Sequence, residues 1–268
     1  MAPRIVLHFH PGWGFDDTTV LQAIATSGWY RSQWQTGTSN GGLMADRGSD
    51  RWRWESTMFA GRYDDAPALD RPVYGAWNRH DDPYGASPRF GSAYLRLRPD
   101  VNERATFCWP DSVYEPQNVS GPQNLEQLCR LADSSDVDPS LVSSAPADLP
   151  LDEPLNDYVE AHVHGGLLVT RDVEAVVVDP ADRKEHSATL ARLGCAVEEH
   201  PGYRVTADAI DPGYRGLVPV ELAHRLGDEI TPARLARASR SRNHDPQAIK
   251  WLWHCLARFG RHWPEART

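Results

Sequence analysis

The chain has 268 residues, 40% hydrophobic and 24% charged, which is enough to fold around a substantial core. Its formal net charge of −9 argues against a surface that coats nucleic acid nonspecifically, because such surfaces need basic patches to release counterions. No apolar run approaches the length of a membrane span, so we expect no membrane partner.

The cysteines restrict both the metal chemistry and the cellular compartment. No two of them have CxxC spacing, so a cysteine zinc site is not expected, but the spacing does not exclude two disulfides. No secretory signal precedes the core-like residue Ile5. We therefore expect a cytoplasmic protein, or one that is exported without a classical signal peptide. The four cysteines are Cys108, Cys129, Cys195 and Cys255.

The N-terminal quarter predicts a strand, a helix and two polar segments. Residues 4–10 form an apolar strand that Pro11-Gly12 ends. Residues 18–28 have apolar side chains at helical spacing and a final glycine, which predicts a helix. The polar, glycine-containing stretch 29–42 is expected to be a loop with a function, and 45–72 an irregular insertion.

The middle of the chain predicts short strands. Candidates are 71–78, 88–99 and 104–109, and the clearest is 88–99, where polar and apolar side chains alternate. Residues 110–155 are rich in proline, serine and aspartate and form a second insertion, with one helix near 123–132.

The last part predicts strands at 157–165 and 170–180, a helix at 182–193 and a strand with a turn at 195–205. A final helix begins after Asp245 and carries an apolar stripe that should dock on the rest of the protein.

Because strands and helices do not alternate regularly, we predict an α+β fold with a mainly antiparallel sheet core and flanking helices. The expected organisation is one catalytic-like domain over residues 1–220 and a C-terminal helical extension over 221–268.

Two polar rows interrupt strands that are otherwise apolar. His8 and His10 share one face of the first strand, and Glu160, His162 and His164 share one face of a late strand. Ionisable groups repeated on one face of a buried strand are costly unless they bind or react. These rows are therefore the first candidates for a functional site.

One hypothesis for the rows is a metal-dependent hydrolase. The first pair can present two imidazoles to one zinc ion, and His162 and His164 would add two more if the strands are neighbours. Glu160 would then act as a ligand or a base. A different hypothesis is a noncatalytic binding module, in which the tryptophans and arginines of residues 29–54 recognise a peptide or nucleotide.

The strings LHFHP, YRSQWQTGTSNGGL, RPVYGAWN, PRFGSAYLRLRP and DYVEAHVHGG together resemble a bacterial domain family of unknown function, over about residues 4–220. The order of features is also similar to that of ADP-ribosyltransferases. Those enzymes have a His or Arg on the first strand, a Tyr or Ser on a middle strand and a Glu on a late strand.

This second resemblance implies that NAD is the substrate and that its nicotinamide–ribose bond is broken. Glu160 would stabilise the oxocarbenium-like transition state, His10 would bind the adenosine ribose and Tyr94 would stack on nicotinamide. An Arg-Ser-Glu alternative would use Arg4, Ser39 and Glu160. The other residues implied to contact NAD are His8, Arg31, Gln33, Ser39 and Asn40.

The sequence does not identify the acceptor of ADP-ribose. Tyr158 stands two residues before Glu160, where members of the family that modify arginine have Glu or Gln. A protein is one candidate acceptor.

Overall fold

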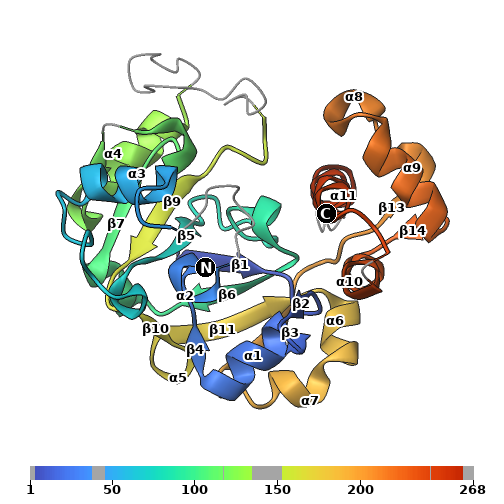
Figure 1. Ribbon diagram of the computed structural model, residues 1–268, viewed down its shortest axis with the longest axis horizontal. Helices are drawn as coiled ribbons and strands as arrows, with labels where there is room; N and C mark the ends of the chain where they lie inside the picture. The colour runs from blue at the N-terminus through green and yellow to red at the C-terminus, as the bar shows by residue number, and fades with distance from the viewer. Residues whose placement is uncertain (1–3, 38–45, 117, 135–152, 242, 262–268) are drawn as a thin grey trace, which may run out of the picture. The chain divides into compact units, whose positions relative to one another are not determined.

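The computed structural model describes residues 4–37, 46–116, 118–134, 153–241 and 243–261 (Figure 1). They divide into two compact units, each assembled from three segments of the chain. Unit 1 consists of residues 1–7, 28–87 and 96–174, and unit 2 consists of residues 8–27, 88–95 and 175–268.

The largest feature is an eight-stranded sheet with the strand order β12-β11-β6-β1-β5-β9-β7-β8. The pairs β1–β5, β5–β9, β9–β7 and β7–β8 are antiparallel, and β11–β12 is parallel. The predicted α+β fold with a mainly antiparallel sheet is therefore confirmed. In chain order the strands are β1 (Ile5–Phe9), β5 (Val73–Trp77), β6 (Ala93–Leu97), β7 (Ala105–Cys108), β8 (Val119–Ser120), β9 (Val159–Val163), β11 (Val173–Val178) and β12 (Ala196–Glu199).

Unit 1 contains β5, β9, β7 and β8 with short helices around them. Every residue of β9 is buried. Helix α4 packs against β7 and β9, and β4 (Trp29–Tyr30) pairs with β10 (Leu167–Leu168). The helices of this unit are α2 (Gln33–Thr36), α3 (Asp50–Met58), α4 (Leu125–Ala132) and α5 (Val169–Asp172).

Helix α3 corrects the prediction that residues 45–72 are irregular. The helix follows Ser49, whose hydroxyl accepts a hydrogen bond from the backbone N–H of Trp52. Its buried residues are Arg51, Trp54 and Glu55, so two of the three carry charge. A helix whose inner face is charged lacks the apolar spacing by which sequence patterns reveal helices.

Unit 2 is mainly helical. The predicted helix 182–193 is two shorter helices that meet at His186. The small strand pairs are β2 (Gly14–Phe15) with β3 (Thr18–Thr19), and β13 (Val205–Thr206) with β14 (Glu229–Ile230). The helices are α1 (Val20–Ser27), α6 (Pro180–Glu185), α7 (Ser187–Leu190), α8 (Pro212–Arg215), α9 (Leu217–Leu226), α10 (Pro232–Ser241) and α11 (Pro246–Phe259).

The C-terminal helix packs within unit 2. Ile249, Leu252, Trp253 and Leu256 of its predicted stripe are buried, and α11 packs against α9 and α10 (Figure 1). Residue 220, where the sequence predicts a boundary, lies inside α9. Residues 221–268 thus belong to the same compact unit as residues 175–220, because the apolar stripe buries itself on α9.

Two further expectations concern the cysteines and membranes. All four cysteines are free thiols. Across the described ranges, we find no helix with the length and apolar character that a membrane crossing requires.

Asp182 of α6 is a buried carboxyl group whose charge should make the stability of the protein depend on pH. Burial raises its pKa from 3.8 to about 7, and Asp179 and Glu185 add to the shift. Between these two values the folded chain binds more protons than the unfolded chain, so stability falls as pH rises. We predict that Asp182→Asn is more stable than the wild type at about pH 8, by on the order of 2–4 kcal/mol.

Urea unfolding at about pH 4 and about pH 8 measures this effect. The stability difference between variant and wild type should shrink as the pH falls toward 4. An equal difference at both pH values would contradict the prediction.

Candidate functional site

Strand β9 carries one of the polar rows that the sequence singles out, and it lies between β5 and β7. Its register places Glu160 opposite Cys108 of β7. His162 lies opposite Tyr74 of β5 and Thr106 of β7. Because residues two apart on a strand point to the same face, these side chains share one face of the sheet.

Glu160 is held in a fixed orientation. It is only 6% exposed, and its Oε2 accepts a hydrogen bond of 3.1 Å from the Ser112 hydroxyl. The donor atoms of Cys108, Glu160 and His162 lie within 4.8 Å of one another. However, burial, followed by the charges of Glu160 and Asp111, raises the pKa of the Cys108 thiol well above 9.0. The protonated thiol can donate a weak hydrogen bond to Glu160 Oε1, which lies 4.0 Å from the sulfur.

A chain of hydrogen bonds with one direction leads to Glu160. A carboxylate only accepts, so His162 donates from Nε2 to Glu160 Oε1 (3.0 Å), and its Nδ1 accepts from Thr106 (3.0 Å). Thr106 Oγ1 then accepts from His164 Nε2 (3.0 Å), and His164 Nδ1 accepts from the Tyr63 hydroxyl (2.5 Å). The carboxylate thus fixes the tautomers of both histidines.

His164 is neutral at physiological pH. Burial, followed by the charges of His162 and two nearby arginines, lowers its pKa to about 4. The series of hydrogen bonds that ends at Glu160 therefore includes the neutral imidazole of His164, as the direction of these hydrogen bonds requires.

Helix α3 places Arg51 beside this face. The guanidinium is 4.4 Å from the centre of the Tyr74 ring, and the Arg51 residue is 7% exposed. Burial opposes its charge, but Tyr74 and the charges of Glu160 and Glu55 together raise its pKa above the usual value of an arginine. In the part of the chain that the structure describes, its Nε and Nη1 find no hydrogen-bond acceptor. Arg51 therefore offers two buried donors next to a buried carboxylate.

Glu55, one turn after Arg51, joins α3 to the rest of unit 1. It is completely buried, and its Oε2 accepts from Arg71 Nη1 (2.7 Å). Its Oε1 accepts from Trp34 Nε1 (2.7 Å) and from the Tyr74 hydroxyl (2.8 Å). A buried carboxylate needs such partners, so these bonds fix α3 against the strands.

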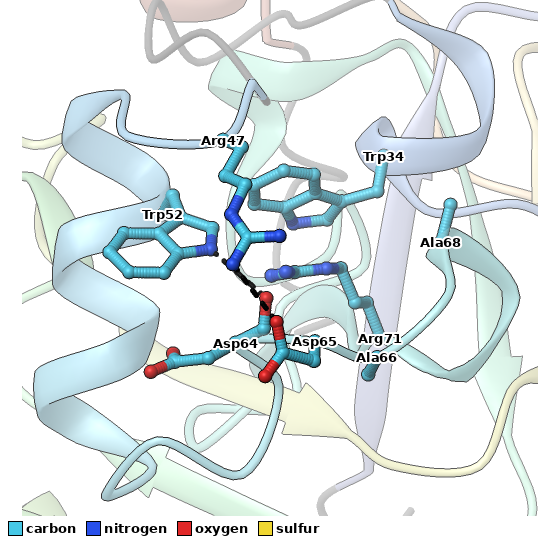
Figure 2. A pocket seen from close by; sticks show the side chains of 8 residues that line it. All are labelled: Trp34, Arg47, Trp52, Asp64, Asp65, Ala66, Ala68 and Arg71. Atoms are coloured by element: carbon cyan, nitrogen blue, oxygen red, sulfur yellow. Dashed lines mark hydrogen bonds and ion pairs between the residues drawn. The ribbon is translucent and has the colours of Figure 1, made fainter.

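A surface hollow of about 200 Å³ lies beside this network (Figure 2). The Arg71 guanidinium lies 3.7 Å from the centre of the Trp34 ring, and Figure 2 shows Arg47 and Asp65 beside the two indoles. Arg71 and Trp34 line the hollow and donate to Glu55, which also accepts from Tyr74, the residue whose ring contacts Arg51. The hollow is lined by Trp34, Arg47, Trp52, Asp64, Asp65, Ala66, Ala68 and Arg71.

The first-strand histidines belong to unit 2. His8 Nδ1 lies 3.0 Å from the carbonyl oxygen of Gly91. The His10 ring stacks on Trp13 at 3.9 Å and meets Trp253 edge-on at 4.7 Å. Burial is the main cause that lowers the pKa of each histidine to about 3, so both are neutral at physiological pH.

The other predicted residues are spread over several elements. Tyr94 of β6 is buried in unit 2, 5.3 Å from the His8 ring. Arg31 is exposed and Gln33 is half-buried in unit 1. Ser39 and Asn40 lie outside the described residues.

The metal-dependent alternative loses the geometry that it requires. It needs neighbouring strands for its two pairs of histidines, which are His8 with His10 and His162 with His164. In the sheet, β5 lies between β1 and β9.

Sequence reasoning identified Glu160 but missed the groups that surround it. Ser112 and Thr106 are short polar residues in or next to strands and give no signal in a single sequence. Arg51 and Glu55 do give a signal in the sequence. They carry opposite charges and are four residues apart, which places them on one helix face with Trp54.

A family model described as "Protein of unknown function (DUF3626)" matches residues 4–132 and 119–259. No curated protein matches the chain. Two solved structures of DarT from Thermus sp. 2.9 are similar, one in complex with NAD+ and one in complex with ADP-ribosylated ssDNA. They are 11% and 10% identical, have TM-scores of 0.39 each, and the alignments cover 74% of this chain and 95% and 94% of theirs.

We predict that Glu55→Ala destabilises the protein by about 3–5 kcal/mol, because it leaves the buried Arg71 guanidinium without its carboxylate. Urea unfolding monitored by tryptophan fluorescence measures this loss. Glu126→Gln on α4 is the matched control, since its carboxylate is 86% exposed and pairs with the exposed Arg130 on the same helix. Equal stability of Glu55→Ala and the wild type would show that α3 is held by other contacts.

Proposed function

We propose that this chain, which belongs to the family described as protein of unknown function (DUF3626), is an NAD-dependent ADP-ribosyltransferase. It would break the bond between nicotinamide and ribose and transfer ADP-ribose to an acceptor. One observation carries the proposal: Glu160 and Arg51 are both buried and interact electrostatically, and Arg51 Nε and Nη1 have no hydrogen-bond acceptor among the described residues.

The reaction needs a carboxylate beside the ribose. Nicotinamide leaves with the electron pair of the C–N bond, and positive charge develops on the ribose C1′ and its ring oxygen. The acceptor then bonds to C1′ through a lone pair and gives its proton to solvent. A carboxylate that is already oriented stabilises the developing charge without reorganising.

The surroundings of Glu160 support this role. Ser112 donates to Oε2, and His162 and the Cys108 thiol donate to Oε1, which fixes the plane of the carboxylate. A carboxylate oxygen can accept two hydrogen bonds, so Oε2 can accept one more. Glu160 can therefore hold a ribose hydroxyl while it remains anchored to the sheet.

Arg51 supplies the complementary charge. Its Nε and Nη1 are adjacent donors of one planar group, which is the arrangement that binds two phosphate oxygens at once. We assign it to the pyrophosphate of NAD. The roles of His10 at the adenosine ribose and of Tyr94 at nicotinamide stay part of the proposal, as do contacts from His8, Arg31, Gln33, Ser39 and Asn40.

We predict that Glu160→Gln lowers the rate of nicotinamide release from NAD by about 100-fold or more, because the amide cannot neutralise the developing charge. The measurement uses NAD labelled in the adenosine part and scores nicotinamide release and label transfer to protein, to single-stranded DNA and to water. Calorimetry should show that the variant still binds NAD, and Glu126→Gln should behave like the wild type. Full turnover in Glu160→Gln would refute the mechanism.

Arg51 is tested separately through the concentration dependence on NAD. We predict that Arg51→Gln raises KM for NAD by roughly 10-fold or more, since it removes a charge-assisted hydrogen bond to phosphate. Arg53→Gln is the matched control, because Arg53 lies on the same helix but is exposed. If both variants have the KM of the wild type, Arg51 does not contact the pyrophosphate.

A further inference from the structure

Helix α11 of unit 2 carries a row of basic side chains that the proposed reaction does not use. Lys250, His254 and Arg258 follow one another at intervals of four residues, so they lie along one face of the helix. Arg215 of α8 faces this row, because the Arg215 and Arg258 guanidinium groups lie 4.6 and 5.0 Å from the centre of the same Tyr214 ring. Two elements thus bring four basic groups together.

A fifth basic group, Arg89, comes from the 3-10 turn Pro88–Phe90. The indole N–H of Trp253 in α11 donates to the carbonyl oxygens of Pro88 and Arg89, both at 3.0 Å. These hydrogen bonds anchor the turn on the helix next to His254. The charge of Arg89 acts on both Lys250 and His254.

His254 is the most informative member of the cluster. It is 2% exposed, and within the described residues neither ring nitrogen has a hydrogen-bond partner. A neutral imidazole carries one donor and one acceptor, and leaving buried groups unpaired costs about 1–3 kcal/mol each. Proteins seldom leave such a group unpaired, so we expect a partner for this ring.

The charges around His254 define the ligand that would satisfy it. Burial, followed by the positive charges of Arg89, Arg215 and Lys250, lowers its pKa well below 6.5, so the charged side chains that act on the ring are cationic. Lys250 forms no ion pair with a carboxylate in the described part of the chain. Asp211, which lies near this region, caps α8 through the backbone N–H of Gly213. The missing partner is therefore an anion.

The number and type of donors favour phosphate over a carboxylate. Arg89 and Arg215 supply planar guanidinium groups, Lys250 supplies a compact charge, and a ring N–H of His254 supplies a directed donor. Tetrahedral phosphate accepts hydrogen bonds from several directions and carries up to two charges, so it can use donors from α8, α11 and the turn together. Because Arg215 and Lys250 are only half-buried, the cluster is open to solvent on their side.

We propose that Arg89, Arg215, Lys250 and His254 form a binding site for a phosphate group in unit 2. The proposed reaction at Glu160 does not use these four residues. Its phosphate comes from a phosphate monoester or from the phosphodiester backbone of a polynucleotide, which share the chemistry that the cluster recognises.

Calorimetric titration of the full chain with inorganic phosphate, and separately with a short single-stranded oligonucleotide without terminal phosphates, tests the site. We expect at least one probe to bind with Kd of about 1 mM or below, and Lys250→Gln to weaken that binding by roughly 10-fold. Lys184→Gln, at an exposed position of α6, is the matched control and should bind like the wild type. Binding of phosphate identifies a monoester site, and binding of the oligonucleotide alone identifies a phosphodiester site.

A second readout depends on His254 itself. A bound anion stabilises the imidazolium, so the probe should raise the pKa of His254 in an NMR titration of the ring protons. The variant Glu160→Gln should bind the probe like the wild type, which separates this site from the proposed reaction. The absence of binding by either probe, or equal affinity in the wild type and Lys250→Gln, would overturn the proposal.

Discussion

The structure of unit 1 depends on the pairing of a completely buried carboxylate. Glu55 accepts hydrogen bonds from Trp34 of α2, Tyr74 of β5 and Arg71, which precedes β5. Removing a carboxylate from water costs several kcal/mol unless such partners replace the water. Helix α3 can therefore dock in one orientation only, and that orientation places Arg51 next to the polar face of β9.

The same pairing explains why Arg51 has donors left over. Glu55 lies one turn away on the same helix and would be the natural partner of Arg51, but Arg71 already occupies its Oε2. Glu160, the other carboxylate whose charge acts on Arg51, is in turn held by Ser112 and His162. Each acid is thus satisfied by a different group, and the guanidinium remains available inside the protein. Geometry of this kind suits a site that must receive an anion.

The sequence predicted the sheet better than it predicted the site. Strands such as Val159–Val163 and Val173–Val178 are rich in valine and almost entirely buried, so the β-branched residues that identify them are also the residues that the sheet buries. The sequence pattern did not predict helix α3, because Arg51 and Glu55 lie on its inner face and only tertiary partners make burial of those charges favourable. The hydrogen-bond chain from Tyr63 to Glu160 joins residues 97 positions apart. No local pattern carries that pairing, because it depends on how the backbone brings distant segments together.

Both units keep a buried polar side chain whose hydrogen-bonding capacity is unused, Arg51 in unit 1 and His254 in unit 2. Unpaired buried groups cost about 1–3 kcal/mol each, against a total stability of only about 5–15 kcal/mol for a folded domain. An apolar residue of similar size would avoid this loss at either position. Arg51 is moreover coupled to a carboxylate, whereas the charged side chains that act on His254 are cationic. The surroundings of Arg51 suit a ligand that carries both a phosphate and a developing positive charge. The surroundings of His254 suit an anion alone, so the two units offer different chemistry.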